Sequence, residues 1–137
     1  MGAVIDGEVV SLDGVSAMAD LRLGRATVRV SVRGVSIGQR MRVQLLARDL
    51  ILAVEEPRGL SVRNRLSGRV VGIADDQDGS LLVSVDIGGV IVLSRVTRDA
   101  GTQLGLREGI DLWVLVKATS ASTGCVPHPA LRGHHST

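Results

Sequence analysis

The stretch Leu66–Ile73, LSGRVVGI, decides the fold because it repeats the pattern of an earlier stretch, Ile5–Leu12, IDGEVVSL. Gly68 stands 61 positions after Gly7, and each glycine has an apolar residue two positions before it and two positions after it. Apolar residues at every second position are typical of a strand with one buried face. The sequence therefore indicates two versions of one strand-rich unit.

The offset between the two versions changes along the chain. Gly88 stands 64 positions after Gly24, whereas Gly109 stands 71 positions after Gly38. The change indicates an insertion of seven residues between positions 96 and 106 of the second unit.

The inserted stretch carries helix signals. Thr97 can cap the N-terminus of a helix, Asp99 suits its first turn, and Gly105 can end it. We expect one short helix there, in the second unit only.

Elsewhere short apolar runs alternate with polar residues between turn signals such as Asp13-Gly14 and Gly88-Gly89. The expected strands are Val4–Leu12, Ala17–Leu23, Ala26–Val32, Arg40–Ala47, Arg69–Asp75, Leu81–Ile87, Val90–Val96 and Asp111–Ala118. Residues 47–54 fit either a further strand or the start of a linker. This pattern of short strands with one helix predicts an all-β fold: two tandem small OB-like Greek-key barrels, with the short helix in the second.

Pro57 and Gly59 mark a boundary between a first unit, residues 1–56, and a second unit, residues 57–120. After residue 120 the pattern gives way to Ser, Thr, Gly, Pro and His. We expect residues 121–137 to form a mobile tail.

Composition narrows the class of protein. The chain has 137 residues, of which 45% are hydrophobic, so it can bury a core. Its 16 basic and 14 acidic residues are interspersed, so bulk charge does not indicate a nucleic-acid binder. The single cysteine, Cys125, excludes an internal disulfide and is compatible with a reducing cytoplasm. No apolar run approaches the roughly 20 residues of a membrane helix, so we expect a soluble, cytoplasmic chain without direct membrane contact.

Two segments carry hydroxyl and cationic residues that can bind a small oxyanion. Ser61 and Arg63 stand two positions apart, as do Lys117 and Thr119, so each pair projects from one face of an extended chain. A tetrahedral dianion needs converging hydroxyls, N–H groups and cations of fixed charge. The expected helix start at Thr97 adds free N–H groups.

The same residues carry a family resemblance. Ser61–Asn64 resembles the S-x-R-N box of the molybdate-binding Mop domains, and Val116–Thr119 resembles their closing V-K-A-T strand. The chain is similar to the C-terminal domain of the ATPase subunit of a molybdate ABC transporter. Ligand-contacting positions of that family carry over onto Ser61, Arg63, Lys117, Thr97 and Thr119, and Asn64 matches the box while more plausibly shaping the turn.

The resemblance implies the ligand and the partners. The expected ligand is molybdate or tungstate, with no cofactor and with molybdenum present only as the oxyanion. The expected partners are a second copy in a homodimer, the ATPase domain of a parent transporter and, through it, a membrane subunit. The family also implies that strands are exchanged between units or between chains.

The first unit departs from the family pattern. No S-x-R-N box precedes Gly7, and Leu46 and Arg48 stand where Lys117 and Thr119 stand in the second unit. This asymmetry resembles that of transporter domains more than it resembles the stand-alone storage proteins, in which both units carry the binding residues. The chain also lacks a G-x-x-x-x-G-K-[ST] segment, so we expect a binding domain and not an enzyme.

Three alternatives stay open: a stand-alone molybdate-storage protein, a structural dimerisation domain with a decayed site, and an OB-type nucleic-acid binder. The last is disfavoured because Trp113 is the only aromatic side chain on which a base can stack. A metal site is also disfavoured. Neither the tail residues Cys125, His128, His134 and His135 nor the loop residues Asp75, Asp76 and Asp78 have ligand spacing.

Overall fold

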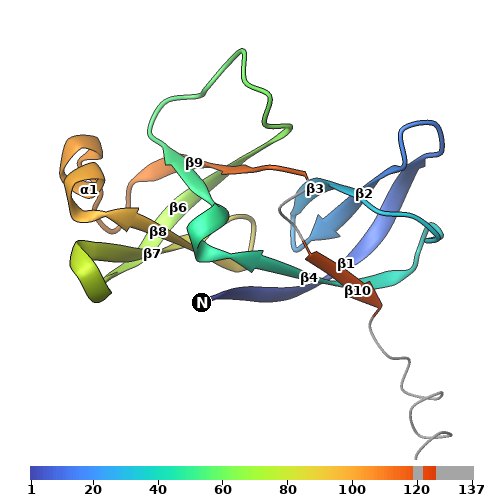
Figure 1. The fold of residues 1–137 in the computed structure, drawn as a ribbon, viewed down its shortest axis with the longest axis horizontal. Helices are drawn as coiled ribbons and strands as arrows, with labels where there is room; N and C mark the ends of the chain where they lie inside the picture. The colour runs from blue at the N-terminus through green and yellow to red at the C-terminus, as the bar shows by residue number, and fades with distance from the viewer. Residues whose placement is uncertain (119–121, 126–137) are drawn as a thin grey trace, which may run out of the picture.

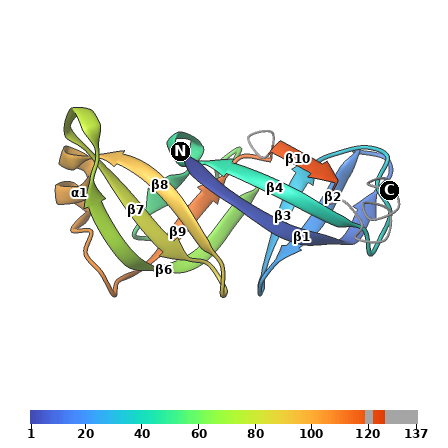
Figure 2. The same ribbon diagram turned by 90° about the horizontal axis from the view of Figure 1, so that it is seen from below.

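The computed structural model describes residues 1–118 and 122–125 and contains two five-stranded sheets that lie side by side (Figure 1). The strand order is β10-β4-β1-β2-β3 in the first sheet and β5-β9-β6-β7-β8 in the second. Both sheets curl strongly, and the helix α1 lies at the outer end of the second sheet (Figure 2). The predicted all-β fold of two tandem OB-like barrels is confirmed.

Each unit contributes its elements in the same order. The first unit consists of β1 (Gly2–Asp13), β2 (Met18–Leu23), β3 (Ala26–Ser31), β4 (Arg40–Leu46), the 3-10 turn η1 (Ala47–Asp49) and β5 (Ile51–Ala53). The second consists of β6 (Asn64–Asp75), the 3-10 turn η2 (Gln77–Gly79), β7 (Ser80–Asp86), β8 (Ile91–Thr97), α1 (Arg98–Leu104), β9 (Asp111–Val116) and β10 (Ser122–Cys125).

The internal repeat is visible in matching irregularities. A bulge interrupts the β1–β2 pairing between Val9 and Ser11, and another interrupts the β6–β7 pairing between Val70 and Gly72. The backbone N–H of Val9 donates to the carbonyl oxygen of Gln39 at 2.9 Å, and that of Val70 donates to Ile110 at 3.0 Å. The two units are therefore copies down to single hydrogen bonds.

The expected short helix is also confirmed. The Thr97 hydroxyl oxygen accepts a hydrogen bond from the Ala100 N–H at 3.0 Å, which caps the start of α1. Gly105 ends the helix in the left-handed conformation, with φ of 65°. Both are the roles that their residue types favour at these positions.

Two features differ from the sequence-based expectation. β6 begins at Asn64, five residues before Arg69, because its first residues pair with β9 from Val116 onward. The expected mobile tail is corrected in part, since Ser122–Cys125 form β10 and supply hydrogen-bond partners to the edge of β4. Residues 121 and 126–137 of that tail lie outside the described residues.

The two units exchange their last strands. β5 follows β4 in the chain but pairs with β9, where Ile51 faces Leu115. β10 follows β9 but pairs with β4, where Ser122 faces Gln44. Since Ser122 stands 71 positions after Ile51 and Leu115 stands 71 positions after Gln44, the exchange is reciprocal. Each sheet is thus completed by a strand from the other half of the chain.

One apolar cluster runs through both units, with buried residues such as Val9, Leu21 and Val43 from the first unit and Val70 and Val114 from the second. These residues occupy alternate positions along their strands, as the sequence pattern predicts.

The hairpin tips of the two units also touch. The Arg25 N–H donates to the Gly88 carbonyl oxygen at 2.8 Å. Gly24 lies in the left-handed region, with φ of +60°, and a Cβ there would come within 2.6 Å of that same oxygen. The close approach of the tips therefore depends on the missing side chain.

Candidate functional site

Arg63 and Lys117 flank the last paired residues of two neighbouring strands. Asn64 faces Val116 in the antiparallel β6–β9 register, so Arg63 precedes one partner of that pair and Lys117 follows the other. Both side chains are exposed, as is Ser61 two residues further out. The structure thus places Ser61, Arg63 and Lys117 at one end of the second sheet.

The linker between β5 and β6 adds further cations to this end. It arches away from the sheets (Figure 1) and encloses a hollow of about 480 Å³, which we call the linker hollow. Its lining residues are Arg58, Gly59, Leu60, Val62, Arg63 and Arg65. None of these described lining residues is acidic. Three arginine residues therefore line one hollow.

Two contacts hold the linker in this shape. The Arg65 guanidinium donates to the carbonyl oxygen of Pro57 at 2.6 Å, which folds the linker back onto the start of β6. Arg58 lies 3.7 Å from a carboxylate oxygen of Glu56, and because the Arg58 side chain is 84% exposed this ion pair contributes little to stability. Sequence reasoning missed Arg58 and Arg65, although the run of arginines near Arg63 was the available signal.

Asn64 is fully engaged within the protein. Its residue is only 5% exposed. Its side-chain oxygen accepts from the Arg29 N–H at 2.7 Å, and its amide nitrogen donates to the carbonyl oxygens of Arg29 at 2.8 Å and Val116 at 3.0 Å. The predicted contact of Asn64 with a ligand stays a prediction, and these bonds occupy both of its amide hydrogens.

Thr97 lies at the opposite end of the same sheet. It faces Ser80 in the β7–β8 register, and the neighbouring Leu81 faces Asp75 at the far end of β6 from Asn64. Within one copy, Thr97 is therefore not brought together with Arg63 and Lys117. Thr119, the remaining predicted site residue, lies outside the described residues.

The first unit presents different chemistry at the matching place. Leu46 and Arg48 line a smaller hollow of about 220 Å³ together with Asp76, Leu82 and Arg95. The Arg95 guanidinium lies 3.1 Å from a carboxylate oxygen of Asp76, so one cation of this hollow is already neutralised. In the linker hollow Arg58 lies near Glu56, but Arg63 makes no ion pair with another described residue. The linker hollow is therefore the better place for an anion.

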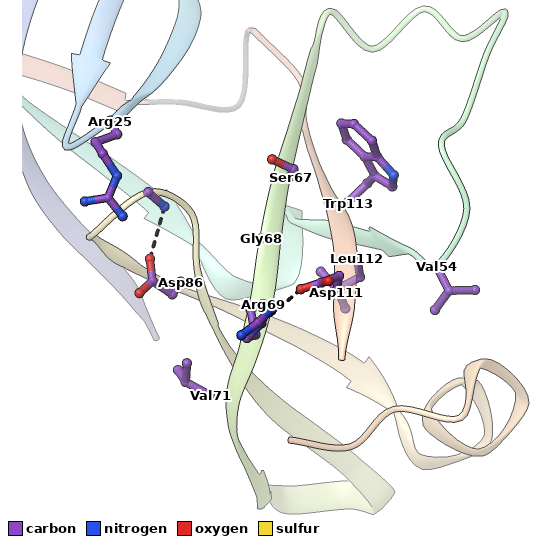
Figure 3. Close-up of a pocket in the computed structure, with 11 residues that line it drawn as sticks. Arg25, Val54, Ser67, Gly68, Arg69, Val71, Asp86, Asp111, Leu112 and Trp113 are labelled. Carbon is purple, nitrogen blue, oxygen red and sulfur yellow. Dashed lines mark hydrogen bonds and ion pairs between the residues drawn. The ribbon is translucent and has the colours of Figure 1, made fainter. Parts of the chain in front are cut away.

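A larger hollow, of about 550 Å³, lies on the outer face of β6 and β9 (Figure 3). Trp113 and Ser67 line it beside an ion pair in which the Arg69 Nε lies 3.0 Å from an Asp111 carboxylate oxygen. Hydrogen bonding to Asp111 raises the pKa of Arg69. Because the two charges offset each other, this hollow offers an oxyanion less than the linker hollow does.

Asp86 stabilises the rim of that larger hollow. Its carboxylate accepts from the N–H group of Gly89 at 2.7 Å. It also accepts from the N–H group of Gly88 at 3.0 Å (Figure 3). The hydrogen bond from Gly89 has the largest effect and, together with the bond from Gly88, lowers the pKa of Asp86 below its ordinary value. The nearby positive charge of Arg25 acts in the same direction. Asp86 thus fixes the β7–β8 tip that meets the β2–β3 tip.

The acidic loop with Asp76 and Asp78 forms the tip of the β6–β7 hairpin. Asp76 accepts from the Gln77 N–H at 2.8 Å, and Asp78 adopts a left-handed conformation in the turn η2. Among residues 1–118 and 122–125, no group of three acidic, His or Cys residues is arranged to hold a metal ion. The three histidines of the tail lie outside the described residues. None of the helices in this part of the chain has the length and apolar character needed to cross a bilayer.

Comparison with known proteins adds three findings. The family model described as the TOBE domain matches residues 60–122. The molybdenum import ATP-binding protein ModC of Rhizobium meliloti (strain 1021) is 37% identical over 119 residues, which is 87% of this chain and 33% of that protein. The protein of the same name from Methylococcus capsulatus (strain ATCC 33009 / NCIMB 11132 / Bath) is 37% identical over 120 residues, covering 87% of this chain and 34% of that protein. The chain thus spans about one third of the length of the curated relatives it matches.

The third finding is a solved structure. The cytoplasmic molybdate-binding protein ModG, in a crystal form with molybdate bound, superposes with a TM-score of 0.79 over 90% of this chain and 96% of its own. Its sequence identity is 24%, so this likeness establishes the fold alone.

Proposed function

We propose that this chain, whose residues 60–122 match the family model described as the TOBE domain, is an oxyanion-binding domain for molybdate or the near-isosteric tungstate. The names of the relatives support the ligand: they are molybdenum import ATP-binding proteins, and the structural neighbour is a molybdate-binding protein.

The observation that carries the proposal is that Arg63 and Lys117 flank the Asn64–Val116 pair, and that Arg63 also lines the linker hollow. A tetrahedral dianion is bound best by cations of fixed charge together with hydroxyl and N–H donors. Arg63 supplies a planar fork, Lys117 a compact point charge and Ser61 a hydroxyl. Arg63 and Lys117 adjoin the paired residues Asn64 and Val116, and Ser61 lies two residues before Arg63 in the linker. No acidic residue is among the described residues that line the linker hollow.

We propose that a second copy of the chain completes the site. Thr97 lies at the far end of its own sheet, so it can meet Arg63 and Lys117 only if it comes from another copy. Thr119, two residues beyond Lys117, would add a hydroxyl from the first copy. In this proposal the homodimer and the oxyanion site are one interface, and molybdenum enters only as the oxyanion.

The proposed biological role is regulation of a cytoplasmic import ATPase. Oxyanion binding regulates a larger assembly only if two arrangements of the dimer differ in affinity for the ligand. The proposed partners are therefore the ATPase domain of a parent protein and, through it, a membrane subunit. The chain itself is proposed to bind its ligand without chemical change.

Isothermal titration of the chain with molybdate, tungstate and sulfate tests the ligand. We expect heat with molybdate and tungstate and little with the smaller sulfate dianion, and an Arg63→Ala variant should lose most of the molybdate heat. No heat with molybdate, or equal heat with sulfate, would contradict a dedicated site. Light scattering with and without molybdate measures the molar mass of the protein, and so tests whether it forms the proposed homodimer.

Only the second unit carries the candidate oxyanion-binding residues. This asymmetry favours a second candidate function, a structural dimerisation domain whose site has decayed. The first unit carries Leu46 and Arg48 where the second carries Lys117 and Thr119. Thermal melting separates the two candidates. Molybdate raises the melting temperature of a binding domain but not that of an Arg63→Ala variant, whereas a structural domain melts at the same temperature with or without molybdate.

A further inference from the structure

One buried side chain connects the proposed oxyanion site to the first unit. The Asn64 amide pairs with both backbone groups of Arg29, accepting from its N–H at 2.7 Å and donating to its carbonyl oxygen at 2.8 Å. The same amide nitrogen donates to the Val116 carbonyl oxygen at 3.0 Å. It therefore joins β3 of the first unit to β6 and β9 of the second.

Hydrogen bonds and ion pairs hold both sides of this contact. Asn64 is 5% exposed, and a buried amide with its donors satisfied has no alternative partner in water. The side chain of Arg29 is itself held, since its guanidinium lies 3.2 Å from Asp13 and 3.6 Å from Asp20. The position of β3 is thus transmitted to the start of β6.

The residues next to these contacts are the proposed ligands. Arg63 immediately precedes Asn64, and Lys117 immediately follows Val116. A single amide therefore fixes the backbone beside both cations. Groups that bind a small ligand need such a supporting shell, because small displacements of the ligating atoms weaken binding.

The matching junction in the repeat has no such amide. Ala3 stands 61 positions before Asn64 and faces Leu45, just as Asn64 faces Val116. β1 there contacts β8 as β6 contacts β3. Since the fold forms this second junction with an alanine, the amide is not a requirement of the architecture, and it occurs at the end that carries the cations.

We propose that Asn64 is a positioning residue for the oxyanion site, and that the degenerate first unit serves as its anchor through the backbone of Arg29. The inference rests on the proposed function. It assigns to the first unit a part in binding that its own sequence, without the S-x-R-N box, does not reveal.

Titration calorimetry and thermal melting of Asn64→Ala test the proposal against a matched control, Val43→Ala. Val43 is fully buried in β4 of the first unit and takes no part in the hydrogen bonds of the Asn64 amide. Both variants should melt at lower temperature than the wild type. We expect molybdate affinity to fall about 10-fold or more in Asn64→Ala, a loss in the range seen for supporting residues of metal sites, and to stay unchanged in Val43→Ala.

The proposal is overturned if folded Asn64→Ala binds molybdate as the wild type does, or if both variants lose affinity in proportion to their melting temperatures. A wild-type chain that gives no heat with molybdate instead overturns the proposed function itself, so the two failures are distinguishable.

A measurement on the wild type covers the case in which Asn64→Ala does not fold. Saturation with molybdate should slow amide exchange of the Arg29 N–H, which donates to Asn64, because coupling between a ligand and a supporting contact is reciprocal. Exchange of the Gly38 N–H, which donates to the carbonyl oxygen of Val9 and takes no part in the contacts of Asn64 and Arg29, should not change. An Arg29 exchange rate that molybdate leaves unaltered contradicts the proposal.

Discussion

The backbone N–H of Arg25 lies 2.8 Å from the carbonyl oxygen of Gly88, and this hydrogen bond joins the hairpin tips of the two units. The contact is close because Gly24 presents no side chain to Gly88. It ties the β2–β3 hairpin to the β7–β8 hairpin at a place separate from the Asn64 junction.

Gly24→Ala should therefore lower the free energy of unfolding by more than the strain of a left-handed alanine alone. Gly34 is the matched control, because its φ of +73° is also left-handed but no atom lies within 4 Å of a Cβ built there. We expect Gly34→Ala to cost about 1–2 kcal/mol, the penalty of a left-handed alanine, and Gly24→Ala to cost clearly more in urea unfolding. Equal losses would mean that the tips separate freely.

Removal of β10 should weaken the first unit, although β10 follows the second in sequence. A chain ending at Ala118 lacks the strand that pairs with β4 from Met41 to Gln44. We expect a loss of about 1–3 kcal/mol from the missing ladder bonds and faster amide exchange in β4. A chain ending at Cys125 retains the strand and should match the full-length protein. Faster exchange confined to β9 would contradict the exchanged arrangement.

Arg63 and Lys117 should act on one ligand. If both contact the same dianion, Arg63→Ala and Lys117→Ala should each weaken molybdate binding by about 10- to 100-fold, the effect of losing a hydrogen bond to a charged group. The double variant should lose less than the product of the two effects, since neighbouring contacts are not independent. Strictly multiplicative losses would place the two cations at separate ligands.

Asp86 should make the tip contact dependent on pH at the acid end. Its folded pKa lies below the ordinary value because Gly89 and Gly88 donate to the charged carboxylate. The stabilisation is therefore present above the unfolded pKa of about 3.9 and is lost as pH falls through the lower folded pKa. Asp86→Asn should be less stable than the wild type at pH 7, and the difference should shrink as the solution is acidified below about pH 4. Thermal melts from pH 7 to pH 2 measure it.

The sequence was sufficient to locate the repeated strands and the inserted helix. Gly7 and Gly68 located matching strands, and Thr97 with Gly105 located the helix, because alternation and capping are properties of a few neighbouring residues. Arg63 and Lys117 could be chosen as candidates from their motifs, but their position was not predicted: Arg63 immediately precedes β6 and Lys117 immediately follows β9.

The family resemblance implied an exchange of strands between units or between chains, but the residues themselves did not show which strands are exchanged. Ile51–Ala53 and Ser122–Cys125 are too short to carry a pattern, and which edge each one joins is decided by the distant strands β9 and β4. The role of Asn64 was hidden for the same reason. Its partner Arg29 stands 35 positions earlier, and a backbone partner leaves no trace in residue type.

The reciprocal exchange also limits how such a chain can be recombined. A chimera joining the first half of one relative to the second half of another at residue 56 would place a foreign β5 against β9 and a foreign β10 against β4. Recombination between the halves therefore creates two mismatched strand pairings instead of one. The two repeats are expected to change together during evolution.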